Sequence, residues 1–262
     1  MKRQEVTLES PPTSPHLGVL LPIHSNAPFP YADYTHAKNS LAAALNGPCF
    51  YATLTGNSGM GKTSLLRELS ATLERPRHAL LYFSSSRASV FSVSRLIARA
   101  LHISPRYSYL ETVNALIEVI ETQKTHFVLW IDEADQLELS TLQEIRMLAE
   151  SDISTTQVLT VLLSGLPRLL NVLDSPPLFP LKRRISQHFK LSGLTMNELD
   201  GFLQHRFGLG ANRLVGTAKE ELFERTGAAP AVLDTVFRRA LEKSEGDINS
   251  EAIRAVLDTA GL

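Results

Sequence analysis

A glycine-rich segment that ends in a basic and a hydroxyl residue could bind phosphate. Four residues separate Gly56 from Gly61, and Lys62 and Thr63 follow directly. Glycines here let backbone N–H groups approach phosphate oxygens, and the helix predicted to start near Lys62 points its positive end at them. Lys62 would supply a charge for the β- and γ-phosphates, and the Thr63 hydroxyl would coordinate Mg²⁺. The nucleotide-binding residues predicted from this segment are Gly56, Asn57, Ser58, Gly59, Met60, Gly61, Lys62, Thr63 and Ser64.

A second pair of candidate residues begins 70 positions after Lys62. Phe127–Ile131 is a continuous apolar run, as expected of a strand buried on both faces, and Asp132 and Glu133 follow it. Alone, this pattern is typical of a strand that runs into a solvated turn. Beside a phosphate loop, the first carboxylate can hold the hydration shell of Mg²⁺, and the second can deprotonate an attacking water. We therefore expect Thr63 and Asp132 to hold magnesium, and Glu133 to be the base that hydrolyses ATP.

The residues that precede the first predicted helix could contact a nucleotide base. Pro30, Tyr31 and Tyr34 are candidates to stack on adenine, although simple packing of the N-terminal arm explains them equally well. Tyr34 joins the nucleotide-binding residues on this basis. Trp130, in the middle of the apolar run, is expected to be a core residue. The eight histidines include no pair within five positions, so no metal site is predicted beyond the Mg²⁺ that accompanies ATP.

Holding these side chains at the ends of strands requires a sheet with helical connections. Strand-like and helix-like segments alternate along the first part of the chain, which predicts an α/β fold with a mostly parallel sheet and right-handed crossovers. The predicted strands are residues 49–54, 79–84, 127–131, 158–163 and 185–191. The predicted helices are residues 34–46, 62–73, 89–101, 109–122, 140–150, 195–206, 218–226, 231–242 and 250–259.

The pattern becomes purely helical after Leu194, which predicts a separate small all-α domain. The first 28 residues are polar and rich in proline, as in an extended arm. We therefore divide the chain into an N-terminal arm at 1–28, an α/β nucleotide-binding domain at 29–193 and a helical domain at 194–262.

Composition excludes several classes of protein. Hydrophobic residues make up 44% and charged residues 20%, which is typical of a globular chain and not of a disordered one. The one cysteine, Cys49, excludes a disulfide framework and a cysteine-based zinc site. No apolar run reaches the roughly 18–20 residues of a membrane span. The short run Leu17–Ile23 contains Pro22, which argues against a signal peptide. We expect a cytoplasmic protein.

Charge is distributed unevenly although the formal net charge is only −1. Residues 62–106 carry a net charge of +6, and residues 107–155 carry −8. This asymmetry could form one basic face on an acidic body.

Together these motifs resemble the AAA+ ATPases. Within that family the chain is similar to the branch of the ExeA, TniB, TnsC and MuB ATPases, which carries a Gly-x-Pro-x-Leu turn after the fourth strand. The resemblance covers roughly residues 30–242. Besides the phosphate loop, the segments that carry it are Asp132-Glu133-Ala134-Asp135, Ser164-Gly165-Leu166-Pro167-Arg168-Leu169, Arg184-Ile185, Phe189-Lys190-Leu191 and Arg206-Phe207.

The resemblance implies a P-loop AAA+ three-layer sandwich followed by a small all-α lid domain. It also implies that Arg184 is an arginine finger for the γ-phosphate bound by a neighbouring subunit, so that hydrolysis would need a ring or a helical filament. Arg183 is the alternative finger, and a solvated cluster of charges is the alternative reading of both. Ser164 would be the polar sensor after the fourth strand. The implied catalytic residues are Glu133, Lys62, Arg184 and Ser164.

Two positions depart from the family. Leu166 stands where a Gln or Thr is often found, and Ala231 stands where an arginine usually begins a lid helix. The missing lid arginine would weaken the link between nucleotide and lid, which predicts slow hydrolysis or a lid charge supplied by Arg238 or Arg239.

Related DNA-bound ATPases place DNA-contacting loops between the second and third strands. The DNA candidates in that segment, which would contact phosphates and not read bases, are Arg87, Arg95, Arg99 and Arg106; solvated helix faces are the alternative.

The implied function is an ATP-dependent, DNA-binding ATPase that oligomerises on duplex DNA and regulates transposition by recruiting a transposase or integrase. One alternative is an ExeA-like secretion-associated ATPase, which usually continues into a membrane span and a cell-wall-binding region. The other is a nucleotide-dependent signalling switch.

Overall fold

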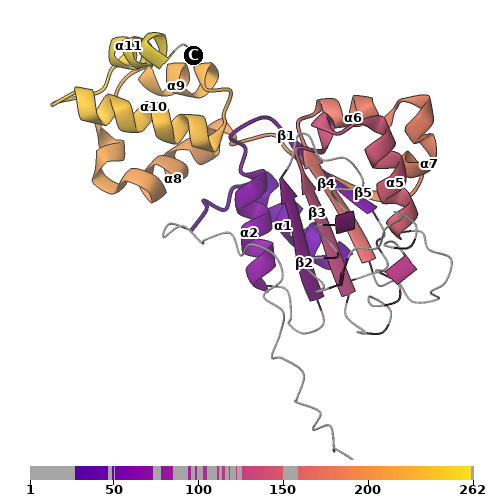
Figure 1. Ribbon diagram of the computed structural model, residues 1–262. Helices are drawn as coiled ribbons and strands as arrows, with labels where there is room; N and C mark the ends of the chain where they lie inside the picture. The colour runs from indigo at the N-terminus through magenta and orange to yellow at the C-terminus, as the bar shows by residue number, and fades with distance from the viewer. Residues whose placement is uncertain are drawn as a thin grey trace, which may run out of the picture.

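A five-stranded parallel sheet forms the centre of the larger part of the molecule (Figure 1). The computed structural model describes residues 27–46, 49, 51–72, 78–84, 126–149 and 159–260, with scattered residues between 94 and 122. The strand order is β2-β3-β4-β1-β5, so β4 lies between β1 and β3. The strands are β1 (Tyr51–Gly56), β2 (His78–Ser84), β3 (His126–Asp132), β4 (Leu159–Gly165) and β5 (Ile185–Leu191). The predicted fold class, a mostly parallel α/β sheet, is confirmed.

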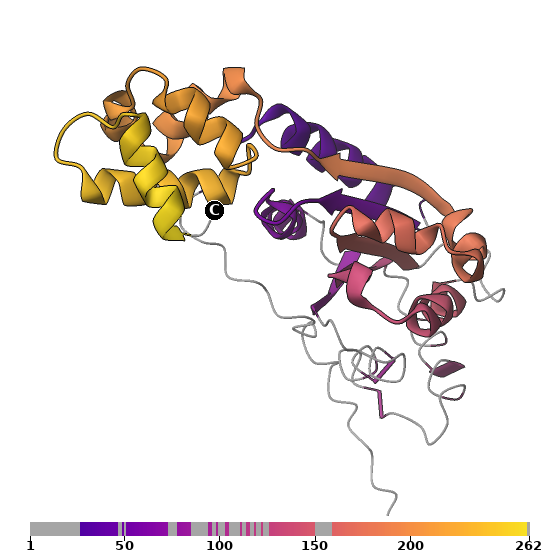
Figure 2. The same ribbon diagram turned by 90° about the horizontal axis from the view of Figure 1, so that it is seen from above.

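Helices cover both faces of this sheet, because successive side chains of a buried strand point to opposite sides. On β3, Val128 and Trp130 pack in the core formed with α1 (Ala32–Leu45) and α2 (Lys62–Thr72). Leu129 and Ile131 pack in the core on the other face. The helices of that face are α5 (Leu139–Ala149), α6 (Arg168–Leu173) and α7 (Phe179–Lys182), and Figure 2 shows the layers from above.

Four helices after β5 form a second, purely helical part beside the sheet (Figures 1 and 2). They are α8 (Met196–Phe207), α9 (Ala218–Arg225), α10 (Pro230–Lys243) and α11 (Ser250–Ala260). We call them the C-terminal helices. The buried side chains of α10 recur at helical spacing, so one face of this helix packs into the core of the C-terminal helices. They are Leu233, Val236, Phe237 and Ala240.

A single carboxylate joins the C-terminal helices to the start of α1. Glu198, in the first turn of α8, accepts hydrogen bonds from the Thr195 backbone N–H at 2.8 Å and the Ala32 backbone N–H at 2.6 Å. The first bond belongs to a capping box on α8, and the second satisfies the first N–H of α1. Beside it, the ring of Phe29 packs edge-on against Phe202 of α8. The N-terminal segment is therefore fixed between the sheet and the C-terminal helices.

Most predicted elements are present within two residues of their expected ends. The short helices α6 and α7 were not predicted, and neither were the 3₁₀ turns Ala134–Gln136, Pro176–Leu178 and Gly208–Arg213. Only scattered residues of the helices predicted at 89–101 and 109–122 are described, and most of the arm at 1–28 lies outside the described residues. Among the helices that are described, none has the length and apolar character needed to cross a bilayer.

Candidate functional site

The glycine-rich segment forms the loop between β1 and α2 that its sequence predicts. Gly59 and Gly61 have φ values of +80° and +91°, which side chains other than glycine's rarely adopt. Lys62 begins α2 and turns back, so that its Nζ donates to Gly56 O at 2.7 Å and to Asn57 O at 3.1 Å. Burial lowers the pKa of Lys62, while Asp132 and Asp135 act in the opposite direction. The loop thus holds a partly desolvated ammonium group on its own carbonyls, which a phosphate could displace.

The Asp132 carboxylate lies at the carboxyl end of β3 and faces the start of α2. Its Oδ2 accepts a hydrogen bond from the Thr63 hydroxyl at 3.4 Å, and its Oδ1 accepts one from the Glu133 backbone N–H at 3.0 Å. A hydroxyl and a carboxylate are the hard oxygen donors that Mg²⁺ prefers. The donor set predicted for the metal is therefore assembled in one place, and it fits the ion. Among the described residues, no group of three or more acidic, histidine or cysteine side chains is arranged to hold a metal ion.

Glu133 adopts an unusual backbone conformation at the end of β3. Its φ is +55°, in the left-handed region, and its side chain is exposed. For a residue other than glycine this conformation costs roughly 1–2 kcal/mol, and such outliers concentrate at functional sites. The strain is consistent with a carboxylate placed for chemistry, next to the residue that would hold the metal.

Ser164 lies at the end of β4, directly between the two strands that carry the loop and the carboxylates. It is fully buried, and its hydroxyl donates to Asp132 Oδ1 at 2.7 Å. The indole N–H of Trp130 donates to Ser164 Oγ, also at 2.7 Å. The expected sensor residue is thus hydrogen-bonded to the carboxylate that is predicted to hold the metal. Trp130 is a core residue, as predicted, but its link to the site was missed because only the sheet register brings the two side chains together.

A second buried carboxylate, also missed as a site residue, anchors the turn after β4. Asp135 accepts hydrogen bonds from the Leu166 backbone N–H at 3.0 Å and from Arg168 Nε at 2.5 Å. A Cβ on Gly165 would lie 2.4 Å from Asp135 Oδ1, so this approach requires glycine. The apolar Leu166 therefore belongs to a turn that is held through its backbone.

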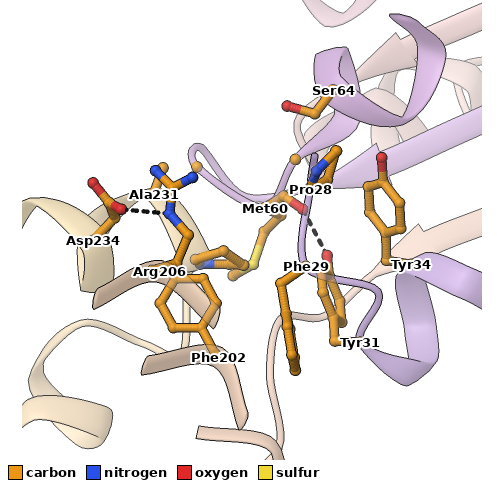
Figure 3. Close-up of a pocket in the computed structure, with 13 residues that line it drawn as sticks. Pro28, Phe29, Tyr31, Tyr34, Met60, Ser64, Phe202, Arg206, Ala231 and Asp234 are labelled. Carbon is orange, nitrogen blue, oxygen red and sulfur yellow. Dashed lines mark hydrogen bonds and ion pairs between the residues drawn. The ribbon is translucent and has the colours of Figure 1, made fainter. Parts of the chain in front are cut away.

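A pocket of about 390 Å³ opens between the phosphate loop, the N-terminal segment and the C-terminal helices (Figure 3). The Tyr31 hydroxyl donates to Met60 O at 2.6 Å, and the Tyr34 hydroxyl donates to Glu68 at 2.9 Å. Burial is the main cause that raises the pKa of both tyrosines. Of the three predicted base-contacting residues, Tyr31 and Tyr34 line the pocket and Pro30 does not. The full lining is Pro28, Phe29, Tyr31, Tyr34, Gly59, Met60, Gly61, Ser64, Phe202, Arg206, Pro230, Ala231 and Asp234.

The described arginines that were predicted as a finger, a lid charge or a DNA contact do not line this pocket. Arg183 and Arg184 are exposed and precede β5, and the Arg184 guanidinium donates to Pro180 O at 3.1 Å. Arg238 and Arg239, the expected substitutes for a lid arginine, are exposed on α10 and do not line the pocket. Of the DNA candidates, Arg95 is exposed; Arg87, Arg99 and Arg106 lie outside the described residues.

Comparison with known proteins agrees with this geometry. Residues 50–173 match the protein family described as an AAA domain. The chain has the fold of the P-loop AAA+ ATPases. Over 117 residues it is 28% identical to general secretion pathway protein A of Aeromonas hydrophila; the match covers 44% of this chain and 21% of that protein, so the chain spans only about a fifth of this curated relative.

Solved AAA+ structures align with most of the chain at low sequence identity. The Aeropyrum pernix ORC2 protein, solved as ADPNP-ADP complexes, aligns with a TM-score of 0.63 and 14% identity over 92% of this chain and 70% of its own. The Aeropyrum pernix ORC1 protein in complex with DNA aligns with a TM-score of 0.60 and 18% identity, over 92% and 68%. The alignments extend beyond the AAA domain match into the C-terminal helices, so they support the AAA+ fold for both parts.

Proposed function

We propose that this protein binds and hydrolyses ATP. The observation that carries the proposal is the meeting of the phosphate loop and the β3 carboxylate, with Thr63 Oγ1 at 3.4 Å from Asp132 Oδ2. In an open parallel sheet, ligands bind in the crevice beyond the carboxyl ends of the strands, and this pair lies there. The AAA domain match over residues 50–173 supports the same activity.

Each residue of the site has a distinct role in this proposal. Lys62 exchanges its two carbonyl partners for phosphate oxygens, and the loop N–H groups bind the same phosphates. Thr63 and Asp132 hold Mg²⁺, which when bound neutralises the charge on the phosphates. Glu133 accepts the proton of the attacking water. Ser164 holds the Asp132 carboxylate in place.

Two substitutions test this proposal. Lys62→Ala removes the positive charge that would bind the phosphates and should abolish ATP binding, measured by calorimetry. Glu133→Gln leaves the binding residues intact and should retain ATP while phosphate release stops. A Glu133→Gln protein that hydrolyses ATP at the wild-type rate would show that the base is another residue. Binding that is unchanged in Lys62→Ala would contradict the nucleotide site itself.

We further propose that Arg184 completes the site of a neighbouring subunit. The register of β1 and β5 pairs Tyr51 with Ile185 and Gly56 with Leu191. Arg184 therefore lies at the amino end of the sheet, whereas the phosphate loop lies at the carboxyl end, roughly 20 Å away along the strands. The guanidinium cannot reach the loop of its own chain. The exposed apolar side chains Leu170 and Phe179 lie on the helices that lead to Arg184, where a second subunit could cover them.

Mixing two inactive variants tests the proposed arrangement in trans. Arg184→Ala subunits keep an intact loop, and Lys62→Ala subunits keep an intact finger. Interfaces that combine the two should recover part of the hydrolysis, since fingers of this kind contribute roughly 10³–10⁵ in rate. A mixture as inactive as its separate components would contradict a finger in trans.

The finer assignment that we propose is an ATPase that assembles on duplex DNA and regulates transposition. The resemblance of its motifs to those of the TniB, TnsC and MuB type supports it, and so does the basic segment at 62–106. The similarity in fold to a protein solved in complex with DNA is consistent with it. Similarity to general secretion pathway protein A favours one alternative, a role in secretion. Adjacent genes would distinguish them: a transposase or integrase gene supports the first role, and secretion genes support the second.

A further inference from the structure

Among the described residues that line the pocket beside the phosphate loop, one carries a cationic side chain, and sequence reasoning did not select it for the site. Arg206, in the last turn of α8, lines the pocket together with Ala231 and Asp234 of α10. Figure 3 shows the Arg206–Asp234 pair on the wall formed by the C-terminal helices, across from Ser64 and Tyr34. A bound nucleotide would therefore lie between this guanidinium and the start of α2.

The charges around Asp234 do not cancel. Arg206 Nε donates to Asp234 Oδ1 at 2.7 Å, and Arg238 Nη2 donates to Asp234 Oδ2 at 2.9 Å. Among the described residues, two guanidinium groups thus share one carboxylate, which leaves one positive charge in this cluster without a partner carboxylate. The Arg206 side chain is 23% exposed and that of Arg238 is 52% exposed, so water screens Arg206 less.

Arg206 and Arg238 differ in whether their guanidinium N–H groups can bind a ligand in the pocket. Arg238 lies over the ring of Phe207, with 5.4 Å between its guanidinium carbon and the ring centroid, and it does not line the pocket. Within the described part of the chain, Arg206 uses only Nε for hydrogen bonds, so its two Nη groups remain available as donors. A planar guanidinium held by a carboxylate at one edge is well suited to bind phosphate oxygens with the other.

The first turn of α10 touches the loop without contributing a charge. The Ala231 backbone N–H donates to Gly59 O at 3.1 Å, and a Cβ built on Gly59 would lie 3.3 Å from the Ala231 Cβ. The C-terminal helices are therefore docked on the phosphate loop at a methyl group. The cation that α10 lacks at this contact is present in the same pocket, on α8.

We propose that Arg206, held by Asp234, supplies the positive charge with which the C-terminal helices contact the phosphates of a bound nucleotide. This inference rests on the proposed ATP site. It assigns to α8 the contact that the sequence would have placed on α10. The nucleotide then bridges the two parts of the molecule, and the position of the C-terminal helices depends on whether a phosphate chain is present.

Equilibrium binding of ATP to Arg206→Met and Arg238→Met tests this inference without measuring hydrolysis. Both variants remove one guanidinium from Asp234 and keep an unbranched side chain, but only the first removes a pocket cation. We expect Arg206→Met to weaken ATP binding roughly 10- to 100-fold, the effect of one charged hydrogen-bond contact. Arg238→Met should stay within about twofold of the wild type. Unchanged binding in Arg206→Met, or an equal loss in both variants, would overturn the inference.

A third variant separates the phosphate contact from the stability of the helical pair. Asp234→Asn removes the ion pair but keeps the Arg206 charge. The affinity for ATP should therefore fall less than in Arg206→Met, while the melting temperature falls. A loss as large as that in Arg206→Met would show that the pair acts only by holding the helices, and would overturn the inference. If Lys62→Ala abolishes ATP binding and Arg206→Met leaves the ATP affinity unchanged, this inference fails while the proposed ATP site stands. A wild-type protein that binds no ATP overturns both proposals.

Discussion

Asp132 is held by an unusually complete set of donors for one carboxylate. The Thr63 hydroxyl, the Glu133 backbone N–H and the Ser164 hydroxyl all point at its oxygens. Trp130 adds a fourth group behind them, because its indole N–H occupies a lone pair of Ser164 Oγ. The hydroxyl proton of Ser164 is consequently directed to Asp132. Side chains that orient a metal ligand in this way commonly change metal affinity 10- to 100-fold when they are removed.

Trp130→Phe should therefore weaken the response to Mg²⁺ more than the binding of the nucleotide itself. Phenylalanine keeps an aromatic ring in the core but lacks the N–H, so Ser164 is free to rotate away from Asp132. We expect ATP affinity without Mg²⁺ to change less than twofold, and the Mg²⁺ concentration for half-maximal ATP binding to rise about 10-fold. A titration with Mg²⁺ at fixed ATP measures both.

Leu162→Val is the packing control for this experiment. Leu162 is paired with Trp130 in the sheet register and is fully buried in the same core. The substitution leaves a small cavity, at roughly 0.5–1.5 kcal/mol, without touching the hydrogen bonds. If both variants shift the Mg²⁺ midpoint equally, loosened packing is the cause and Trp130 does not position the carboxylate.

Among the elements, α1 and α8 begin at the same carboxylate. Partial burial alone would raise the pKa of Glu198, but hydrogen bonds from the backbone of Thr195 and Ala32 and from the Thr195 hydroxyl lower it overall. The ionised form is thus the one that the folded protein stabilises. A group with a lowered pKa stabilises the fold above its unfolded pKa of about 4.3, and this stabilisation is lost as the pH falls through the folded pKa.

Glu198→Ala should lower the free energy of unfolding by about 1–2 kcal/mol at pH 7, the usual effect of losing a helix cap. The starts of α1 and α8 both lose the carboxylate that accepts their backbone hydrogen bonds, so the N-terminal segment and α8 should both loosen. Chemical denaturation at pH 7 and at pH 3.5 measures the effect. The wild type and the variant should differ less at the lower pH, since Glu198 is then more often protonated. A difference that grows with acidity would contradict this role.

How far the sequence predicts these elements depends on the range of the interactions that form them. The phosphate loop and the apolar β3 are encoded in local spacing, and both are found at the predicted residues. The helices α6 and α7 are only six and four residues long, too short for a helical period to stand out. The bonds of Trp130 and Arg206 join residues 28 to 34 positions apart, and only the sheet register and the packing of α8 on α10 bring them together. The division into domains at 193 and 194 stays a prediction.

At the scale of the whole molecule, the two ends of the sheet carry different parts of the proposed reaction. The loop and the carboxylates lie at the carboxyl ends of the strands, and Arg184 precedes β5 at the amino end. One copy of the chain therefore presents a nucleotide at one place and a guanidinium at another. Copies arranged head to tail would bring the two together, and such a heterologous contact generates either a ring or a helical filament.

Assembly of this kind predicts how the protein should bind DNA. A chain with a net charge of −1 has little long-range attraction for a duplex, and its few arginines neutralise only a few phosphates. Subunits that ATP lines up along one duplex bind next to others already held there, so weak contacts add up. We expect binding that requires ATP, depends little on base sequence and falls steeply with salt.

Replacing Arg87 and Arg95 together by Ala should weaken this binding while ATP affinity is unchanged. Because each lost phosphate contact reduces the slope of log affinity against log salt by about 1, the double variant should show a slope smaller by up to about 2 for each bound subunit. The matched control replaces Arg225 and Arg254 on α9 and α11, which changes the net charge equally but acts on the C-terminal helices. Fluorescence anisotropy of a labelled duplex with ATP, with ADP and without nucleotide, across a salt series, gives both quantities. Equal affinity in all three nucleotide states, or an equal loss in the control, would contradict a filament that contacts DNA through the segment between β2 and β3.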